Sequence, residues 1–176
     1  MRLIELIGQN VKWQQPRIMK MEYELRADDR VVANLRFRSA FSSFATAECA
    51  DGTWTFKRIG LWHPKVTIHS RGENTNLAIF VNNSWSGGGT LELSDERKYP
   101  AKTNFWASQL EFQTEMGEPL VSYRKIGGLL HLSSEIEIAP FAKGVISELP
   151  WIVLLGWYLH VMMHNDASAG VAATMG

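Results

Sequence analysis

Two histidines close to the end of the chain have a spacing that could hold a metal ion. His160 and His164 are four residues apart, so a helix would place them on one face, and Asp166 follows as a third candidate ligand. The zinc-protease motif is not present, because valine rather than glutamate follows His160. We therefore expect His164 to interact with the C-terminal dipole of a helix. No metal or other cofactor is predicted, and a site at His160 and His164 remains the alternative.

The sequence contains no motif that is typical of a catalytic nucleophile or of a phosphate-binding loop. Cys49 is the one cysteine, and it ends an alternating run in which a small strand residue is expected. Ser84 and Ser86 are not part of the Gly-x-Ser-x-Gly elbow of hydrolases. Gly87-Gly88-Gly89 is not followed by the Lys-Ser/Thr pair of a phosphate-binding loop, which favours a hairpin turn. The sequence therefore predicts a protein that is not an enzyme.

Basic residues give the most concrete indication of a binding function. Arg36 and Arg38 share one face of an alternating run, and Lys57 faces outward in another such run. Cations gathered in this way attract the headgroups of anionic lipids, although alternation also places basic residues on solvent-facing surfaces that have no function. We predict lipid-headgroup binding by the following residues: Arg36, Arg38, Lys57, Arg58, Arg124 and Lys125.

Trp62-His63-Pro64 is an aromatic loop between two alternating runs. We expect this loop to pack against the rest of the protein. The alternative is that it inserts into an interface or binds a partner.

Apolar and polar residues alternate in short runs up to about residue 140, which is typical of β-strands. Asp51-Gly52 between two such runs is a strong signal for a hairpin. Strands at a spacing of about 8–12 residues are typical of sandwiches and barrels. The expected strands cover about residues 2–7, 19–26, 31–37, 44–49, 53–59, 65–70, 77–81, 90–93, 99–105, 110–114, 120–124 and 129–138.

The run from Leu149 to Met163 contains no charged residue and is too long for one strand. Ser147 could cap a helix here and Asn165 could end it, which predicts a helix over about residues 147–164. Since the run is apolar on every side, the helix must be surrounded by protein or by lipid.

A barrel of more than eight strands needs more than its own side chains to fill the interior. A helix of about 18 residues spans ~27 Å, and strands of about seven residues span ~23 Å, so the two lengths match. The sequence therefore predicts an all-β fold with one helix, namely an antiparallel barrel of about twelve strands around a buried hydrophobic C-terminal helix. A membrane anchor is the alternative, but the run is shorter than the ~20 residues that a span requires. It also contains Pro150, Gly156 and His160, so no transmembrane span is expected.

Three local segments stand out within this pattern. They are Tyr23-Glu24-Leu25, the segment DGTWTFKR at 51–58 and the segment ELPWIVLLG at 148–156. Together with the meander of short strands and the closing hydrophobic helix, they resemble the Tubby C-terminal-like barrel superfamily, which includes the Tubby domain, the phospholipid scramblases and the LURP-one-related proteins. The resemblance implies a barrel threaded by its helix, and it implies association with phosphoinositides or membranes. The cysteine-rich and proline-rich segments of scramblases are absent from this sequence.

The composition fits one globular domain. The chain has 176 residues, 45% of them apolar and 20% charged, so we expect a single domain over residues 1–166 and a tail over 167–176. Lys plus Arg (18) equals Asp plus Glu (18), which argues against a strongly basic nucleic-acid binder. The N-terminus lacks the features of a signal peptide and the lone cysteine fits a reducing compartment. We therefore expect a cytoplasmic location with peripheral contact to a membrane.

These observations predict a non-enzymatic binding or scaffold protein whose partner is an anionic phospholipid surface. One alternative is an enzyme or small-ligand binder with a pocket at one barrel end near His160 and His164. A second alternative is a protein–protein interaction module.

Overall fold

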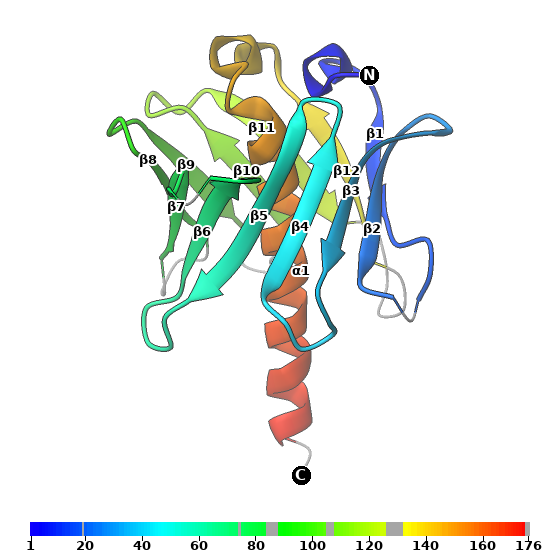
Figure 1. Ribbon diagram of the computed structural model, residues 1–176, viewed down its shortest axis with the longest axis vertical. Coiled ribbons are helices and arrows are strands. Elements are labelled where there is room, and N and C mark those ends of the chain that lie inside the picture. Colours follow the sequence, from blue (N-terminus) through cyan, green and yellow to red (C-terminus); the bar gives the residue numbers. More distant parts are fainter. Residues whose placement is uncertain (19, 74, 84–87, 105–107, 126–131, 175–176) are drawn as a thin grey trace.

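Twelve antiparallel strands form a closed barrel in the computed structural model, which describes residues 1–18, 20–73, 75–83, 88–104, 108–125 and 132–174 (Figure 1). The all-β barrel with one helix that the sequence predicts is confirmed. The strands are β1 (Val11–Gln14), β2 (Glu22–Ala27), β3 (Arg30–Phe37), β4 (Phe44–Cys49), β5 (Gly52–Ile59), β6 (Lys65–Ser70), β7 (Ala78–Asn82), β8 (Gly89–Leu93), β9 (Lys98–Thr103), β10 (Gln109–Gln113), β11 (Pro119–Lys125) and β12 (Ser133–Ile138). The helical elements are the short 3-10 helices η1 (Leu3–Leu6) and η2 (Pro140–Val145) and the α-helix α1 (Leu149–Thr174).

Each strand pairs with its neighbours in the sequence, and β1 closes the barrel on β12 with Val11 opposite Ile136. Because the number of strands is even, the chain enters the first strand and leaves the last one at the same end. We call this the upper end, where η1 and η2 lie in Figure 1. The helix α1 starts there, passes down through the barrel and emerges at the opposite, lower end, where the C-terminus lies (Figure 1).

The interior is filled by α1 and by the inward-facing side chains of the strands. Residues of α1 from Leu149 to Met162 are buried. Trp157 stacks on Trp13 of β1 with ring centroids 5.7 Å apart, and Tyr158 stacks on Phe37 of β3 at 5.5 Å. Burial of each such side chain contributes roughly 1.5–3 kcal/mol. A helix that is apolar on every side is therefore accommodated inside the sheet.

Polar contacts fix the upper end. The buried carboxylate of Glu148, directly before α1, accepts hydrogen bonds from Arg97 of the β8–β9 turn and from the hydroxyl of Ser147. Asp51 of the β4–β5 turn accepts hydrogen bonds from Arg2 Nε at 2.7 Å and from the backbone N–H of Leu3 at 2.8 Å. The start of the helix and the N-terminal segment are thus tied to strand turns.

The first predicted strand, residues 2–7, is wrong. This stretch forms η1, in which Leu3 and Leu6 are buried three residues apart. The first strand is β1, which buries only Val11 and Trp13. A run of this length alternates too briefly to stand out in the sequence.

The predicted end of the helix at Asn165 is also wrong. The helix α1 continues to Thr174, so residues 167–174 are helical rather than a featureless tail. Several of these residues are alanine, which has the highest helix propensity. The predicted cap at Ser147 is replaced by a different arrangement, since its hydroxyl donates to Glu148 and the Glu148 carbonyl accepts from the N–H of Ile152 at 3.0 Å.

Some predicted features lie outside the described residues. They are Ser84, Ser86, Gly87, the first residue of the predicted strand 19–26, the last residue of the predicted strand 99–105, the part of the last predicted strand before residue 132, and residues 175–176 of the predicted tail. Gly88 and Gly89 are described: Gly88 directly precedes β8, Gly89 is its first residue, and β7 and β8 pair as the two arms of a hairpin.

Candidate functional site

The six basic residues predicted to bind lipid headgroups fall into three groups. Arg36 and Arg38 lie on the outer side of β3 and directly after it, and Lys57 lies on the outer side of β5. The N–H of Arg38 donates to the carbonyl of Phe44, and Phe44 is opposite Lys57 in the pairing of β4 with β5. Arg38 and Lys57 are therefore near neighbours on the outer surface, close to the lower end.

Arg58 and Lys125 do not join this outer group. Arg58 has the same strand parity as the buried Phe56, and its guanidinium pairs with Asp166 of α1 at 2.6 Å. Lys125 has the parity of the buried Tyr123, and its Nζ lies 3.5 Å from Nδ1 of His164. Both side chains turn inward toward the helix where it leaves the barrel. They line the lower mouth and not its outer wall.

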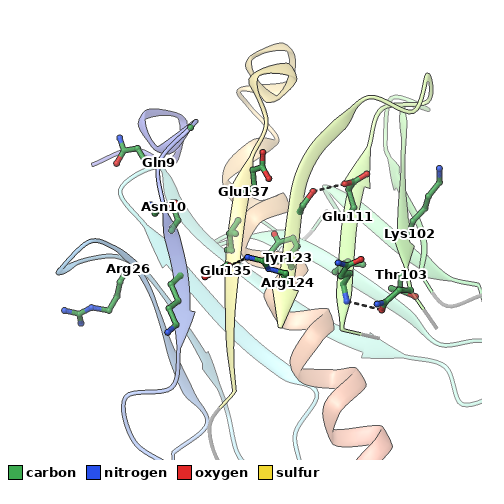
Figure 2. A pocket seen from close by; sticks show the side chains of 18 of the residues that line it. Gln9, Asn10, Arg26, Lys102, Thr103, Glu111, Tyr123, Arg124, Glu135 and Glu137 are labelled. Carbon is green, nitrogen blue, oxygen red and sulfur yellow. Dashed lines mark hydrogen bonds and ion pairs between the residues drawn. The ribbon is translucent and has the colours of Figure 1, made fainter. Parts of the chain in front are cut away.

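Arg124 lies on a separate outer surface, where it pairs with Glu135 of β12. Figure 2 shows both residues in a groove of about 1090 Å³ that runs over the outer sides of β10, β11, β12 and β1. The groove also presents Lys12, Lys102 and Arg26 together with Glu111 and Glu137, so both signs of charge are present. A surface of this kind does not select for an anion.

The two ends of the barrel differ in charge. The lower connections join strands at the end where α1 emerges, and the upper connections join them at the other end. In the sequence, every upper connection contains an aspartate or a glutamate, whereas no lower connection contains either. The upper connections are 28–29, 50–51, 71–77, 94–97, 114–118 and 139–148, and the lower connections are 15–21, 38–43, 60–64, 83–88, 104–108 and 126–132.

Cations surround the lower end. Arg17, Lys20 and Arg38 are exposed in its connections, and Lys57 and Lys65 are exposed on the adjoining strand ends. Among the residues that the structure describes, none of these five pairs with a carboxylate. In the described part of the chain, the acids close to this end already have cationic partners: Glu22 pairs with Arg36, Glu24 with Arg26, Glu135 with Arg124 and Asp166 with Arg58.

Large apolar side chains project from the same lower connections. Phe41 is fully exposed, Leu61 is 88% exposed and Trp62 is 85% exposed, and Ile18 is about half exposed. The expectation that the Trp62-His63-Pro64 loop packs against the protein is therefore wrong for its tryptophan. Met116, Phe141 and Ile146 are exposed at the upper end, but carboxylates lie in the same connections there. In the described parts of the chain, exposed cations without an ion pair also occur at the upper end, at Arg30, Arg71 and Lys143, so the two ends differ in the carboxylates of their connections.

Sequence reasoning missed Arg17, Lys20, Lys65 and the apolar tips as members of one surface. The signal was present, because acidic residues occur in alternate connections along the chain. In an up-and-down meander, alternate connections lie at the same end of the barrel. These two observations together are sufficient to predict the charge difference between the ends.

The two histidines proposed as metal ligands lie in different surroundings. His160 is buried between Trp157 and Tyr123, and among the described residues neither ring nitrogen has a hydrogen-bond partner with acceptable geometry. Burial lowers the pKa of His160 to about 4, the Lys125 ammonium acts in the same direction and the Gly156 carbonyl acts against them. Burial and Lys125 also lower the pKa of the half-buried His164. Within the described residues there is no group of three or more side chains that could hold a metal ion.

Comparison of the chain with protein-family models, with curated proteins and with solved structures finds no match in any of the three. Of the helices that the structure describes, none has both the length and the apolar character needed to cross a bilayer.

Proposed function

We propose that this chain is a non-enzymatic binding protein that docks onto an anionic phospholipid surface with the lower end of its barrel. The observation that carries the proposal is the charge difference between the two ends. Acidic residues occur in every upper connection and in no lower connection, while exposed cations surround the lower end. Although the net charge is zero, the charge is therefore distributed unevenly along the barrel axis, with the acidic residues of the connections at the upper end.

The polarity gives the protein a preferred orientation at a membrane. Each Lys or Arg near an anionic leaflet contributes about 1 kcal/mol of attraction within a Debye length. Arg17, Lys20, Arg38, Lys57 and Lys65 supply this attraction at the lower end. Carboxylates at the upper end are repelled by the same surface, so the lower end, from which the last turns of α1 project (Figure 1), faces the bilayer.

The exposed apolar tips add a second contribution. Phe41, Leu61, Trp62 and Ile18 are exposed in water, and an interfacial position would remove part of their surface from it. Tryptophan in particular is enriched at the level of the headgroups. Peripheral proteins commonly require two such signals, one apolar and one basic, for stable attachment.

Of the six residues predicted from the sequence, the proposal retains Arg36, Arg38 and Lys57 as headgroup contacts. Arg58 and Lys125 face the helix at the lower mouth, where they attract anions that approach along the axis. Arg124 lies in the mixed-charge groove and is not part of the proposed surface. We further propose a cytoplasmic location and membership of the Tubby-like barrel group, which rests on the local segments at 23–25, 51–58 and 148–156.

A protein partner is the second candidate, and the groove in Figure 2 favours it. This groove of about 1090 Å³ presents cations and carboxylates side by side, as a polar protein surface would require.

Flotation with vesicles tests the proposed function. The purified full chain is mixed with neutral phosphatidylcholine vesicles or with vesicles that also contain phosphatidylserine, at low and at moderate salt. We expect binding to the anionic vesicles only, and weaker binding at higher salt. Absence of binding to either vesicle would contradict the proposal, and salt-resistant binding to both would replace it with an anchor based on the helix.

A further inference from the structure

The interior of the barrel is packed unevenly around α1. On the side of β1, β3 and β5, aromatic side chains cover the helix, as in the pairs of Trp157 with Trp13 and of Tyr158 with Phe37. On the side of β6 to β10 a slot remains between the helix and the wall, with a cavity volume of about 50 Å³. One water needs roughly 10–15 Å³ on this scale. The slot is therefore narrow, but its volume exceeds that needed for one water.

The slot is apolar inside and charged at its opening. Leu159, Met162 and Met163 form its helix side, and Val66, Phe80 and Leu110 lie among the residues of its wall. Arg58 and Asp166 stand at its lower opening, where they pair at 2.6 Å. From Leu159 to Asp166 the helix rises by about 10 Å, which gives the depth of the slot along the axis.

The helix stripe that faces the slot is the least covered part of its buried segment. Leu159 and Met162 keep 8% and 7% of their surface exposed, whereas Val161 and Tyr158 keep none. Leu159, Met162, Met163 and Asp166 follow the spacing of one helix face. Methionine side chains are flexible and adapt to the shape of a ligand. Within the described residues, the barrel therefore covers one apolar stripe of its central helix slightly less completely than the rest of the buried segment.

We infer that this slot binds the hydrocarbon chain of a single-chain anionic amphiphile, whose charged group pairs with Arg58 at the lower mouth. The narrow cross-section excludes a two-chain lipid, and an apolar lining favours hydrocarbon over water. Arg58 selects an anionic group, which takes the place of the Asp166 carboxylate. The inference does not require that the lower end binds vesicles, although the two sites share that end.

Titration calorimetry of the full chain with monomeric laurate tests the inference. We expect one laurate per chain, and much weaker binding of dodecyltrimethylammonium, which has the same chain with a cationic group. Arg58→Ala should weaken laurate binding by about tenfold or more, because it removes a charged hydrogen bond. Asp166→Ala should strengthen it, because it removes the competing carboxylate.

Substitutions that fill the slot test whether laurate binds there. Val66→Phe from the wall and Met163→Trp from the half-buried part of the helix should each abolish laurate binding. Ile146→Phe, at an exposed upper position, is the matched control and should leave it unchanged. Laurate binding that survives both filled variants, or equal binding of the two amphiphiles, would overturn the inference.

Vesicle flotation of the same variants distinguishes this inference from the proposed function. A filled slot should leave flotation with anionic vesicles intact. Loss of laurate binding with intact flotation supports both proposals. Laurate binding by a wild-type chain that does not float with anionic vesicles would support the slot and contradict the proposed function.

Discussion

Gly156 of the central helix lies against the ring of Tyr123, so closely that a Cβ atom on Gly156 would stand 2.2 Å from Tyr123 Cζ. The Tyr123 hydroxyl donates to the carbonyls of Val153 and Ile152, at 2.8 Å and 3.1 Å. Burial raises the pKa of this hydroxyl well above its usual range, so it stays protonated as a donor. The helix and the barrel wall are thus in close contact at this point. Gly156 has no side chain to keep them apart, and Tyr123 donates a buried hydrogen bond to the helix backbone.

Replacing Gly156 with alanine should destabilise the protein. Overpacking of a core costs about 1–3 kcal/mol, which exceeds the ~1 kcal/mol that alanine gains over glycine in a helix. Urea unfolding of Gly156→Ala and wild type measures the difference. Gly144→Ala is the control, because a Cβ there meets nothing within 4 Å. Equal stability of the two variants would show that Tyr123 moves aside without cost.

The contact between Arg97 and Glu148 should matter more than a surface ion pair. The Glu148 side chain is 7% exposed, and Arg97→Ala would leave the Ser147 hydroxyl as the one donor to its carboxylate among the described residues. A buried acceptor that loses a charged partner costs about 1–3 kcal/mol. The free energy of unfolding should fall by an amount in this range.

Arg124→Ala is the matched control for that variant. Arg124 and Glu135 are 68% and 50% exposed, and exposed pairs contribute about 0–1 kcal/mol. A loss of stability as large in Arg124→Ala as in Arg97→Ala would contradict the role assigned to the buried carboxylate.

His160 should make the folded state less stable in mild acid. Its pKa is about 4 in the folded protein, below its ordinary value of 6.5. Between these values the unfolded chain binds a proton that the folded chain does not, so stability falls as the pH falls from about 6.5 to about 4. The difference amounts to up to about 3 kcal/mol.

His160→Phe should remove this part of the pH dependence. In the part of the chain that the structure describes, neither ring nitrogen of His160 has a partner, so phenylalanine removes no hydrogen bond seen there. Unfolding free energies of the variant and of wild type, measured across that pH window, should diverge toward low pH. His63→Phe changes an exposed histidine and should keep the wild-type dependence. Parallel curves for His160→Phe and wild type would rule out a buried neutral imidazole.

The strands and the central helix could be predicted because burial imposes a period on the sequence. Trp54, Phe56 and their polar neighbours alternate, and the run after Glu148 has no polar face. The N-terminal segment could not be assigned in this way, since Leu3 and Leu6 are too few to distinguish a turn of helix from a strand. The extension of α1 beyond Asn165 is exposed from Asp166 to Ala169, so no apolar period marks it, and its alanines favour a helix by propensity.

The candidate site was predicted only in part. Alternation correctly places Arg36 and Lys57 on outer surfaces, but it also shows that Arg58 shares the inward parity of Phe56. A strand residue that points into the barrel can still be charged when it lies at the rim, because the tip of its side chain reaches solvent or a partner on the helix. Which strands come together around the barrel depends on closure, and no local pattern specifies the partner of Arg58 on α1.

The apolar tips should contribute to vesicle binding but not to stability. Leu61→Ser together with Trp62→Ser removes two side chains that are exposed in water. Partial burial of such side chains in a membrane contributes on the order of 1–3 kcal/mol in total. Flotation with anionic vesicles should weaken by about tenfold or more. Met116→Ser removes an equally exposed side chain at the upper end and should change nothing.

The most direct test of the membrane proposal reverses charge at one end of the barrel at a time. Arg38→Glu with Lys57→Glu changes the lower end, and Arg30→Glu with Lys143→Glu gives the same net charge at exposed positions of the upper end. Affinity for phosphatidylserine-containing vesicles is measured by flotation at low salt. We expect the lower variant to bind at least about thirtyfold more weakly than wild type, and the upper variant to stay within a few-fold of wild type. Equal loss in both variants would show that only net charge matters, and would contradict an oriented lower end.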